Sequence, residues 1–307
     1  MTGARNTASV PISVVIPTRN ASADLAHCLA ALTRFDDVVV VDSGSTDDTQ
    51  AIAQRFGARL ITFRWNGRYP KKRNWTLANH SLAHPWVLFL DADEVVDERF
   101  VEEAAAAVTG GDADGYWLSY TNHFNGRPLR FGVPQRKLAL FRVSRGAYER
   151  IDEQRWSALD MEVHEHPIID GPVGALTTPI AHRDRSGLSE FLKRHVAYAE
   201  WEAARWCALH SSGSSSNARA RQTGRQAFKY RHLHRWWLAP AYFLYATVLR
   251  LGILDGAPGL LYAGYKAWYF ATVRQLIHER WRAEAETRAA EGARASAQTA
   301  GMDTINA

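Results

Sequence analysis

Two aspartates separated by one residue, Asp91 and Asp93, directly follow the apolar run at residues 86–90. Carboxylate oxygens are the ligands that hard divalent cations such as Mg²⁺ need, and such a cation commonly also reaches a substrate phosphate. A cation held here would neutralise a diphosphate leaving group. A simple alternative is a solvated turn in which Asp93 caps a helix. The pair therefore indicates a site only if other polar loops join it.

Two other loops have the composition to do so. Pro17, Thr18 and Asn20 follow one β-branched run, and Asp42 ends a run of four valines. The residues after Asp42, Ser-Gly-Ser-Thr-Asp-Asp, fit a strand-to-helix turn with a capping box around Ser45. That interpretation leaves Asp42 itself unexplained, and a carboxylate there could accept hydrogen bonds from a nucleobase or a ribose.

Basic residues occur where a helix is expected to begin. Lys72, Arg73 and Asn74 follow Lys71, and cations at a helix N-terminus are unfavourable unless an anion lies nearby. They fit either the phosphates of a ligand or an ordinary solvated charge run. Arg136, between Gln135 and Lys137, is a weaker indication of the same kind.

The segment DMEVHEHP at residues 160–167 combines carboxylates with two histidines. Its spacing lacks the helical i, i+4 arrangement of a zinc site, so a general base is the better interpretation. Such a base must reach the nucleophilic hydroxyl. Glu165, flanked by imidazoles, is preferred to Glu162. His182, after another short apolar run, is either a core histidine or a ligand.

The elements that must position these residues alternate along the first third of the chain. Short β-branched runs at 12–16, 38–41, 59–63 and 86–90 predict strands buried on both faces, with helical spacing between them. The pattern predicts an α/β sheet with right-handed crossovers and helices on both faces. The polar loops would then converge at the carboxyl ends of the strands, where ligands bind.

The remainder divides into different segments. Shorter strands are expected at 116–120 and 138–141, and helices at 188–209, 218–235 and 260–282. We expect a catalytic domain at 10–185, a helical region at 186–283, and a flexible tail at 284–307.

Charge separates the two halves of the 307 residues. Residues 1–180 carry 19 Lys/Arg and 22 Asp/Glu, whereas residues 181–307 carry 18 and 10, and residues 203–254 contain no acid at all. This stretch indicates an acidic partner. Its neighbours are too apolar for a nucleic-acid face, so we expect an anionic membrane surface and no nucleic acid. A buried helical pair packed on the first domain is the alternative.

Further features limit the cellular setting. The longest later apolar run, at 236–249, is shorter than the ~20 residues that cross a bilayer. The N-terminus lacks the apolar region of a signal peptide, and two distant cysteines predict neither a disulfide framework nor a zinc site. We therefore expect a cytoplasmic protein that is peripheral or monotopic on the inner membrane.

The motifs VVIPTRN, VVVVDSGSTDDT, KKRN and FLDADE, in this order over about 90 residues, resemble the family 2 inverting glycosyltransferases, which have the GT-A fold. The later pieces LALFR, VHEH and LGILDGAPGL resemble the bacterial lipopolysaccharide-core β-glucosyltransferase subgroup. The resemblance covers most of residues 10–280 and is more specific for nucleotide-sugar transfer than for the sugar.

The resemblance implies roles for particular residues. Those that would border the nucleotide-sugar donor are Pro17, Thr18, Asn20, Asp42, Lys72, Arg73, Asn74, Asp91 and Arg136. Asp93, with His182, would bind Mg²⁺ or Mn²⁺, and Glu165 would be the base. The commoner family pattern has a Glu-Asp pair at the base position, whereas this chain has His164-Glu165.

The expected function is transfer of a hexose, glucose from UDP-glucose being favoured, onto a lipid-linked or lipopolysaccharide-core acceptor. Two alternatives stay open. A sugar-phosphate nucleotidyltransferase would also use a carboxylate-bound metal, but it would need a glycine-rich loop that PTRNASAD lacks. A non-catalytic membrane- or nucleic-acid-binding protein would need the basic region but neither Asp91 nor Asp93.

Overall fold

The computed structural model describes residues 9–151, 153, 159–160, 162, 166–210 and 224–305, with the backbone alone for 225 and 288–305. The chain divides into two compact units, Met1–Phe191 with Ala246–Tyr262, and Leu192–Tyr245 with Ala263–Ala307. The strands of the first unit are β1 (Ile12–Thr18), β2 (Val38–Asp42), β3 (Arg59–Thr62), β4 (Trp86–Phe89), β5 (Glu94–Val95), β6 (Gly115–Phe124), β7 (Arg127–Pro128), β8 (Gln135–Arg142), β9 (Gly146–Tyr148), β10 (Pro167–Ile169), β11 (Val173–Ala175) and β12 (Ile180–His182).

The sheet has a parallel half built from the first strands in the chain. Its order is β3-β2-β1-β4, with Thr18 opposite Asp42 at the ends of β1 and β2. Every residue of β1 and β4 is buried, because β-branched and aromatic side chains cover both faces. This register brings the polar loops after β1, β2 and β4 to one edge.

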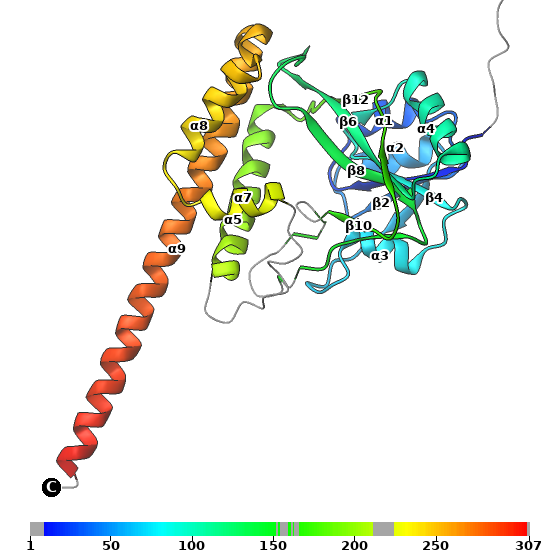
Figure 1. Cartoon of the computed structure of the whole chain (residues 1–307). Helices are drawn as coiled ribbons and strands as arrows, with labels where there is room; N and C mark the ends of the chain where they lie inside the picture. The colour runs from blue at the N-terminus through cyan, green and yellow to red at the C-terminus, as the bar shows by residue number, and fades with distance from the viewer. Residues whose placement is uncertain are drawn as a thin grey trace, which may run out of the picture. The chain divides into compact units, whose positions relative to one another are not determined.

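Helices cover both faces of this half. The helices are α1 (Leu25–Ala30), α2 (Thr49–Arg55), α3 (Lys72–Asn79) and α4 (Glu98–Gly110). The crossovers through α1 and α2 run in one direction along the sheet, and the return from β3 to β4 runs through α3. Right-handed connections then require α3 on the opposite face, and Figure 1 shows it on the side away from α1 and α2.

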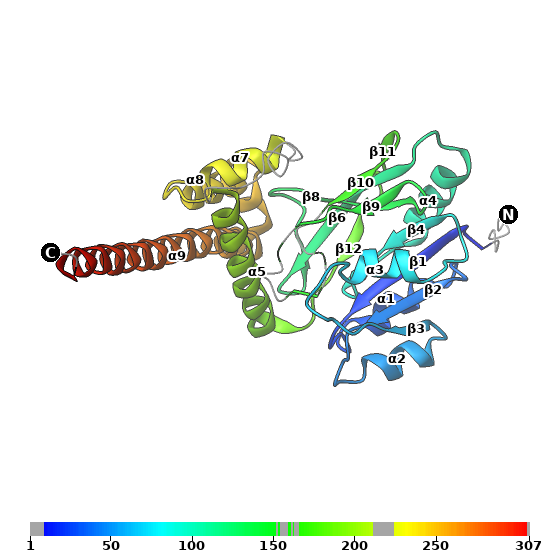
Figure 2. The ribbon, with the colours of Figure 1, turned by 90° about the horizontal axis from the view of Figure 1, so that it is seen from below.

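The second half of the sheet mixes strand directions. β8 is antiparallel to both β4 and β6, and β12 runs parallel to β6 and antiparallel to β5. The pairing of His182 with Glu94 brings β12 against the loop that follows β4. Two strands distant in sequence, β5 and β12, therefore meet beside Asp91 and Asp93. The turned view in Figure 2 shows β12 next to its other partner, β6.

The second unit is helical. It is formed by α5 (Gly187–His210), α7 (Gly224–His232), α8 (Leu238–Leu244) and α9 (Gly256–Ile305). The start of α5, up to Phe191, and the start of α9, up to Tyr262, belong to the first unit. Trp206 is 1% exposed and its indole N–H donates to the Tyr230 carbonyl, whereas Trp236 is 72% exposed. Part of the basic aromatic stretch thus forms a core within the second unit itself.

The segment Ala246–Tyr262, which we call the apolar tip, belongs to the first unit although helices of the second precede and follow it. A π-helical turn (Tyr245–Leu249) begins one residue before the tip, and a 3-10 turn (Gly252–Asp255) lies within it. Leu251 between them has φ 58°, in the left-handed region. The Asp255 carboxylate accepts the backbone N–H of Arg130 at 3.0 Å and of Phe131 at 2.9 Å.

The structure confirms the predicted α/β sheet with helices on both faces and each of the six strands expected up to residue 142. A helical region follows, as expected. α9 continues to Ile305, through residues expected to form a flexible tail. The many Ala, Glu and Arg residues there favour a helix.

Candidate functional site

Asp42 lies fully buried at the end of β2 and is held by donors on three sides. Its carboxylate accepts from the Ser45 N–H at 2.9 Å, the Gln50 amide at 2.8 Å and the Thr18 hydroxyl at 3.0 Å, and also from the Ser45 hydroxyl. Burial raises the pKa of Asp42, but these hydrogen bonds outweigh it, and the pKa lies below its usual value. Asp42 is therefore an anion that shapes the loops after β1 and β2.

The loop after β1 is fastened to the loop after β2. Asn20, with φ 51°, accepts the Thr46 N–H at 2.9 Å through its side chain and donates its own N–H to Ser45 at 2.8 Å. Pro17 is a buried residue of β1, opposite Val41. These residues, which were predicted to border the nucleotide-sugar donor, form one hydrogen-bonded wall of the site at this edge of the sheet.

Lys72 connects this wall to α3. Its ammonium is buried, donates to the Thr18 carbonyl at 2.9 Å, and lies 3.5 Å from the Asp160 carboxylate. Burial lowers the pKa of Lys72, and Asp160 opposes the shift. The anions expected near these cations thus include protein carboxylates, among them Glu153, which pairs with Lys71.

The N-terminus of α3 is capped by Glu162. Its two carboxylate oxygens accept the backbone N–H of Arg73 at 2.8 Å and of Asn74 at 3.0 Å. A carboxylate at this position satisfies two otherwise unpaired donors and complements the helix dipole. Burial raises the pKa of Glu162, and Arg73 and the two N–H groups oppose the rise.

The side chains of Arg73 and Asn74 differ in direction. Arg73 donates to Asp91 at 2.8 Å and its guanidinium lies 5.2 Å from the centre of the Tyr148 ring. Asn74 exchanges two hydrogen bonds of 2.9 Å with the backbone of Tyr148. Asn74 thus fixes β9 to α3, whereas Arg73 reaches the aspartate pair.

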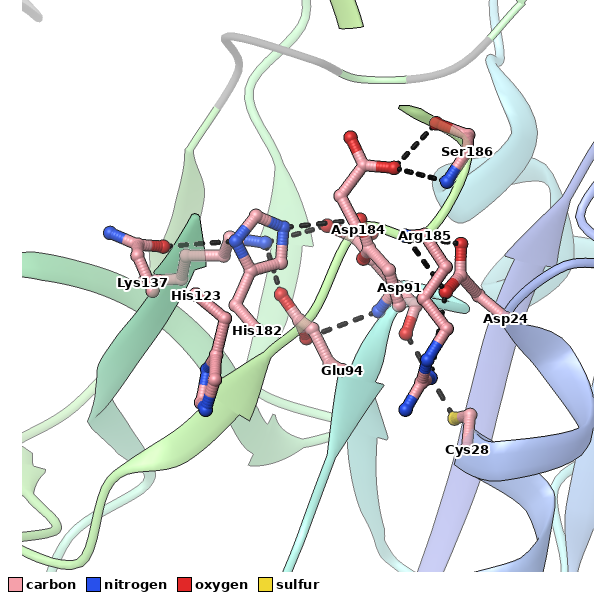
Figure 3. A network of polar contacts seen from close by, with 12 residues as sticks. Asp24, Cys28, Asp91, Glu94, His123, Lys137, His182, Asp184, Arg185 and Ser186 are labelled. Atoms are coloured by element: carbon pink, nitrogen blue, oxygen red, sulfur yellow. Dashed lines mark hydrogen bonds and ion pairs between the residues drawn. The ribbon is translucent and has the colours of Figure 1, made fainter. Parts of the chain in front are cut away.

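Asp91 is clamped between two cations at the end of β4. Besides Arg73, it binds the Lys137 ammonium at 2.6 Å, and Lys137 also donates to Glu94. Burial raises the pKa of Asp91, but Lys137 and Arg73 outweigh it, so its pKa lies well below the usual range. Burial raises the pKa of Glu94 to about 7 in spite of Lys137. Figure 3 shows Asp91, Glu94, Lys137 and His182 gathered at this edge.

Asp93 and His182 face one another. The His182 Nε2 lies 3.1 Å from an Asp93 carboxylate oxygen, and its Nδ1 lies 2.9 Å from the Asn122 side-chain oxygen. Burial would lower the pKa of His182, but Asp93 outweighs it and the pKa lies above its usual value. The structure thus brings together the two predicted metal ligands, from a loop and a strand 89 residues apart in sequence.

The fit of a cation to this pair can be judged from the donor set. A carboxylate oxygen and an imidazole nitrogen that face each other can both bind Mg²⁺ or Mn²⁺, with Asn122 orienting the ring. Within the described residues, no group of three or more His, Cys, Asp or Glu side chains could hold a metal ion. The pair therefore fits a cation that takes its remaining ligands from a bound substrate and water.

The remaining predicted residues fall in different places. Arg136 is exposed on β8, and its neighbour Lys137 is the residue that reaches the site. Glu165 lies outside the described residues. Sequence reasoning did not assign Lys137, Glu94 or Asn122 to the site. Lys137 and Glu94 adjoin predicted residues, and that adjacency is the signal that could have found them.

No single helix in the described part of the chain is long and apolar enough to span a membrane. One pair of helices, Leu238–Leu249 and Gly252–Thr287, meets the length and composition requirements jointly, with a bend of 73° between them.

Residues 13–164 match the family model described as Glycosyl transferase family 2. An uncharacterized glycosyltransferase of Rickettsia felis is 36% identical over 110 residues, which are 36% of this chain and 38% of that protein's length. The lipopolysaccharide core biosynthesis glycosyltransferase LpsC of Rhizobium meliloti is 29% identical over 208 residues, covering 63% of this chain and 71% of LpsC. A solved structure of S. aureus TarS 1–349 with UDP-GlcNAc has a TM-score of 0.47 at 18% identity, over 89% of this chain and 92% of TarS 1–349.

Proposed function

We propose that this chain, whose residues 13–164 match the model of glycosyl transferase family 2, transfers a hexose from a nucleotide sugar to a saccharide acceptor with inversion at the anomeric carbon. The convergence of Asp42, Asp91 and Asp93 at the carboxyl ends of parallel strands carries this proposal. A sheet edge of this kind is where an α/β protein binds a nucleotide.

We further propose UDP-glucose as the donor and a lipopolysaccharide-core or lipid-linked saccharide as the acceptor. The similarity to LpsC over 63% of the chain supports the acceptor class. The resemblance of the motifs to the core β-glucosyltransferase subgroup supports glucose.

The residues of the site divide the work. The wall of Thr18, Asn20 and Asp42 is rigid and would receive the nucleoside, since loops that need no reorganisation lose little entropy on binding. Arg73 and Lys137 keep Asp91 ionised and fixed in position. Asp93 and His182 would hold Mg²⁺ or Mn²⁺, which when bound would neutralise charge that develops on the diphosphate.

The general base is proposed to be Glu165. The competing candidate, Glu162, is 1% exposed, and both of its carboxylate oxygens already accept backbone N–H groups of α3. Because Glu162 is almost fully buried, an acceptor hydroxyl in solvent has little access to its carboxylate. The role of Glu162 is therefore to organise the N-terminus of α3.

Calorimetric titration with a panel of UDP-sugars, in the presence of Mn²⁺ or Mg²⁺, tests the proposal. We expect UDP-glucose to bind in a metal-dependent manner and the transferred sugar to have inverted anomeric configuration by NMR. If no nucleotide sugar binds, the proposed function is wrong.

Removal of the Asp93 charge is the sharpest single change. Asp93→Asn leaves His182 without its carboxylate partner and removes a charged ligand, so metal-dependent donor binding and turnover should both be lost. Asp112→Asn removes an equal charge at an exposed position and should change neither. Equal donor affinity in the Asp93 variant and wild type would exclude a metal role for Asp93.

A further inference from the structure

The apolar tip, Ala246–Tyr262, exposes large hydrophobic side chains to solvent. Leu249 is 74% exposed and Leu254 is 60% exposed, although a globular protein ordinarily buries such residues. The other residues of the tip that share this exposure are Val248, Leu251, Ile253, Leu260 and Leu261.

The exposed charged side chains on and beside the tip are mostly positive. The tip contains two charged residues, Arg250 and Asp255. The Asp255 carboxylate is engaged by the N–H groups of Arg130 and Phe131, whereas the side chains of Arg127, Arg130 and Arg250 are exposed. The surroundings of the exposed apolar residues therefore present cations to solvent, which complements an anionic surface.

The tip is fixed to the catalytic unit rather than loosely attached. The Gly132 N–H donates to the Arg250 carbonyl at 2.8 Å, which adds to the two bonds of Asp255. Gly252 packs so closely that an added Cβ would lie 2.7 Å from the Ala246 carbonyl oxygen. Backbone bonds to the 125–134 loop thus hold the exposed leucines in place.

We propose that the apolar tip inserts into one leaflet of a lipid bilayer, with Arg127, Arg130 and Arg250 at the depth of anionic headgroups. The pair of helices that contains most of the tip, Leu238–Leu249 and Gly252–Thr287, has the length and composition of a broken span or re-entrant segment, with a 73° bend. Figure 1 shows the chain reversing direction between α8 and α9. Apolar faces of monotopic proteins reach about 5–10 Å into the bilayer.

A bilayer fits these observations better than a second copy of the chain. Protein interfaces pair apolar residues with a complementary surface, and a two-fold dimer built on the tip would bring the exposed arginines of both copies together. An anionic leaflet instead receives the leucines and arginines of one molecule at once.

Insertion would also orient the catalytic unit. The loop that holds the tip connects β6 and β8, and these strands carry Asn122 and Lys137. The Leu129 N–H donates to the Asn122 carbonyl at 2.7 Å, close to where the Asn122 side chain contacts His182. This inference goes beyond the proposed activity, because a bilayer contact does not depend on which sugar is transferred.

Vesicle flotation of the full chain tests the proposal, with phosphatidylcholine vesicles that contain about a third phosphatidylglycerol. The double variant Leu249→Ser/Leu254→Ser should float at least about tenfold less than wild type, because it loses apolar burial on both sides of the turn. The control Phe56→Ser/Ile168→Ser changes exposed apolar residues elsewhere in the first unit and should float like wild type. Equal flotation of the tip variant and wild type would overturn the proposal.

A depth measurement separates insertion from surface adsorption and from self-association. The native cysteines are buried, so an environment-sensitive dye can be placed at Leu249→Cys, or at Ile168→Cys as the control. Acyl-chain quenchers should quench the dye at 249 and not at 168. Absence of quenching at 249, or burial of the dye in a lipid-free dimer, would refute insertion. UDP-glucose binding should be unchanged in the Ser double variant, which distinguishes this failure from failure of the proposed function.

Discussion

At the scale of residues, Lys137 joins two carboxylates that would otherwise repel one another. It binds Asp91 at 2.6 Å and also donates to Glu94. Because neither Asp91 nor Glu94 is far from Asp93, loss of this cation would change the charge on the whole group. The geometry therefore assigns Lys137 a positioning role toward the aspartate pair.

Lys137→Met tests that role. The change leaves Asp91 with Arg73 alone, so we expect donor affinity to fall about tenfold, equivalent to ~1.4 kcal/mol. Arg136→Met removes the adjacent cation from an exposed position and should have a much smaller effect on calorimetric donor binding. If Arg136→Met instead weakened nucleotide-sugar binding more than Lys137→Met, Arg136 would be the donor-binding residue, as the sequence predicted.

Asp37 links protonation to stability at a point away from the site. It accepts from the Ser13 hydroxyl at 2.5 Å and the Ala83 N–H at 2.8 Å, and Arg59 lies 3.2 Å away. Burial raises the pKa of Asp37, but these partners outweigh it and leave the pKa below its usual value. Its folded pKa is therefore lower than its unfolded value of about 3.9, so the charged form stabilises the fold above that pH.

Asp37→Asn should accordingly lower the free energy of unfolding at neutral pH. The difference from wild type should shrink as pH falls below about 4, because the wild-type carboxyl then takes up a proton. Denaturant unfolding from neutral pH to pH 3 measures this difference. A difference that stayed constant over the range would show that Asp37 acts through packing alone.

Which basic residue of β8 faces the site could not be predicted from the sequence. Residues Leu138 to Phe141 are buried on both faces, so the strand shows no alternation from which to tell which neighbouring basic residue faces the site. Sequence reasoning chose Arg136, whereas Lys137 reaches Asp91. By contrast, Asp93 and His182 could be paired in advance because the motifs themselves, rather than alternation, identified them.

At the scale of elements, α3 depends on a residue that is distant in sequence. Glu162 satisfies two N–H groups at its N-terminus, and Asn74 ties it to β9. The helix begins with Lys72 and Arg73 and has no acidic residue in its first turn. The Glu162 carboxylate therefore offsets cations that the helix dipole disfavours.

Glu162→Ala should destabilise the chain by roughly 1–3 kcal/mol, since two buried donors lose their acceptors. Glu162→Gln keeps one acceptor oxygen and should lie between Ala and wild type in Tm. Glu165→Gln should leave Tm and donor binding unchanged and lower kcat, if Glu165 is the base. A normal Tm in Glu162→Ala would show that the cap contributes nothing to stability.

At the scale of the whole molecule, the charge difference between the halves of the chain gains a structural context. The exposed arginines around the apolar tip and the basic second half both favour an anionic surface, while the leucines favour its interior. The expected membrane association thus has an electrostatic contribution, which salt screens, and a hydrophobic contribution, which salt does not screen.

Flotation in rising salt separates the two parts. The Debye length shrinks from ~10 Å at 0.1 M to ~3 Å at 1 M, so attraction to headgroups should weaken strongly. Wild type should retain a measurable bound fraction at high salt, whereas Leu249→Ser/Leu254→Ser should lose it. Complete release of both proteins at the same salt concentration would contradict a contribution from insertion.

The attachment of the tip could not be read from the sequence. LGILDGAPGL entered the sequence analysis only through the resemblance to a glycosyltransferase subgroup, whereas its contacts join Asp255 to residues 124 and 125 positions earlier. Periodicity reports local structure, and no local pattern encodes a hydrogen bond of that sequence separation. Strands and crossovers, in contrast, follow from local β-branched runs and were predicted correctly.

The return of the chain to its first unit at Ala246–Tyr262 limits how the protein can be shortened. A fragment that stops after Phe191 would leave the N–H groups of Arg130 and Phe131 without their carboxylate acceptor and strip the 125–134 loop of its cover. Simple C-terminal truncation is therefore a poor route to a minimal catalytic fragment. A design that keeps residues 246–262 and bridges 191 to 246 with a linker would preserve those bonds.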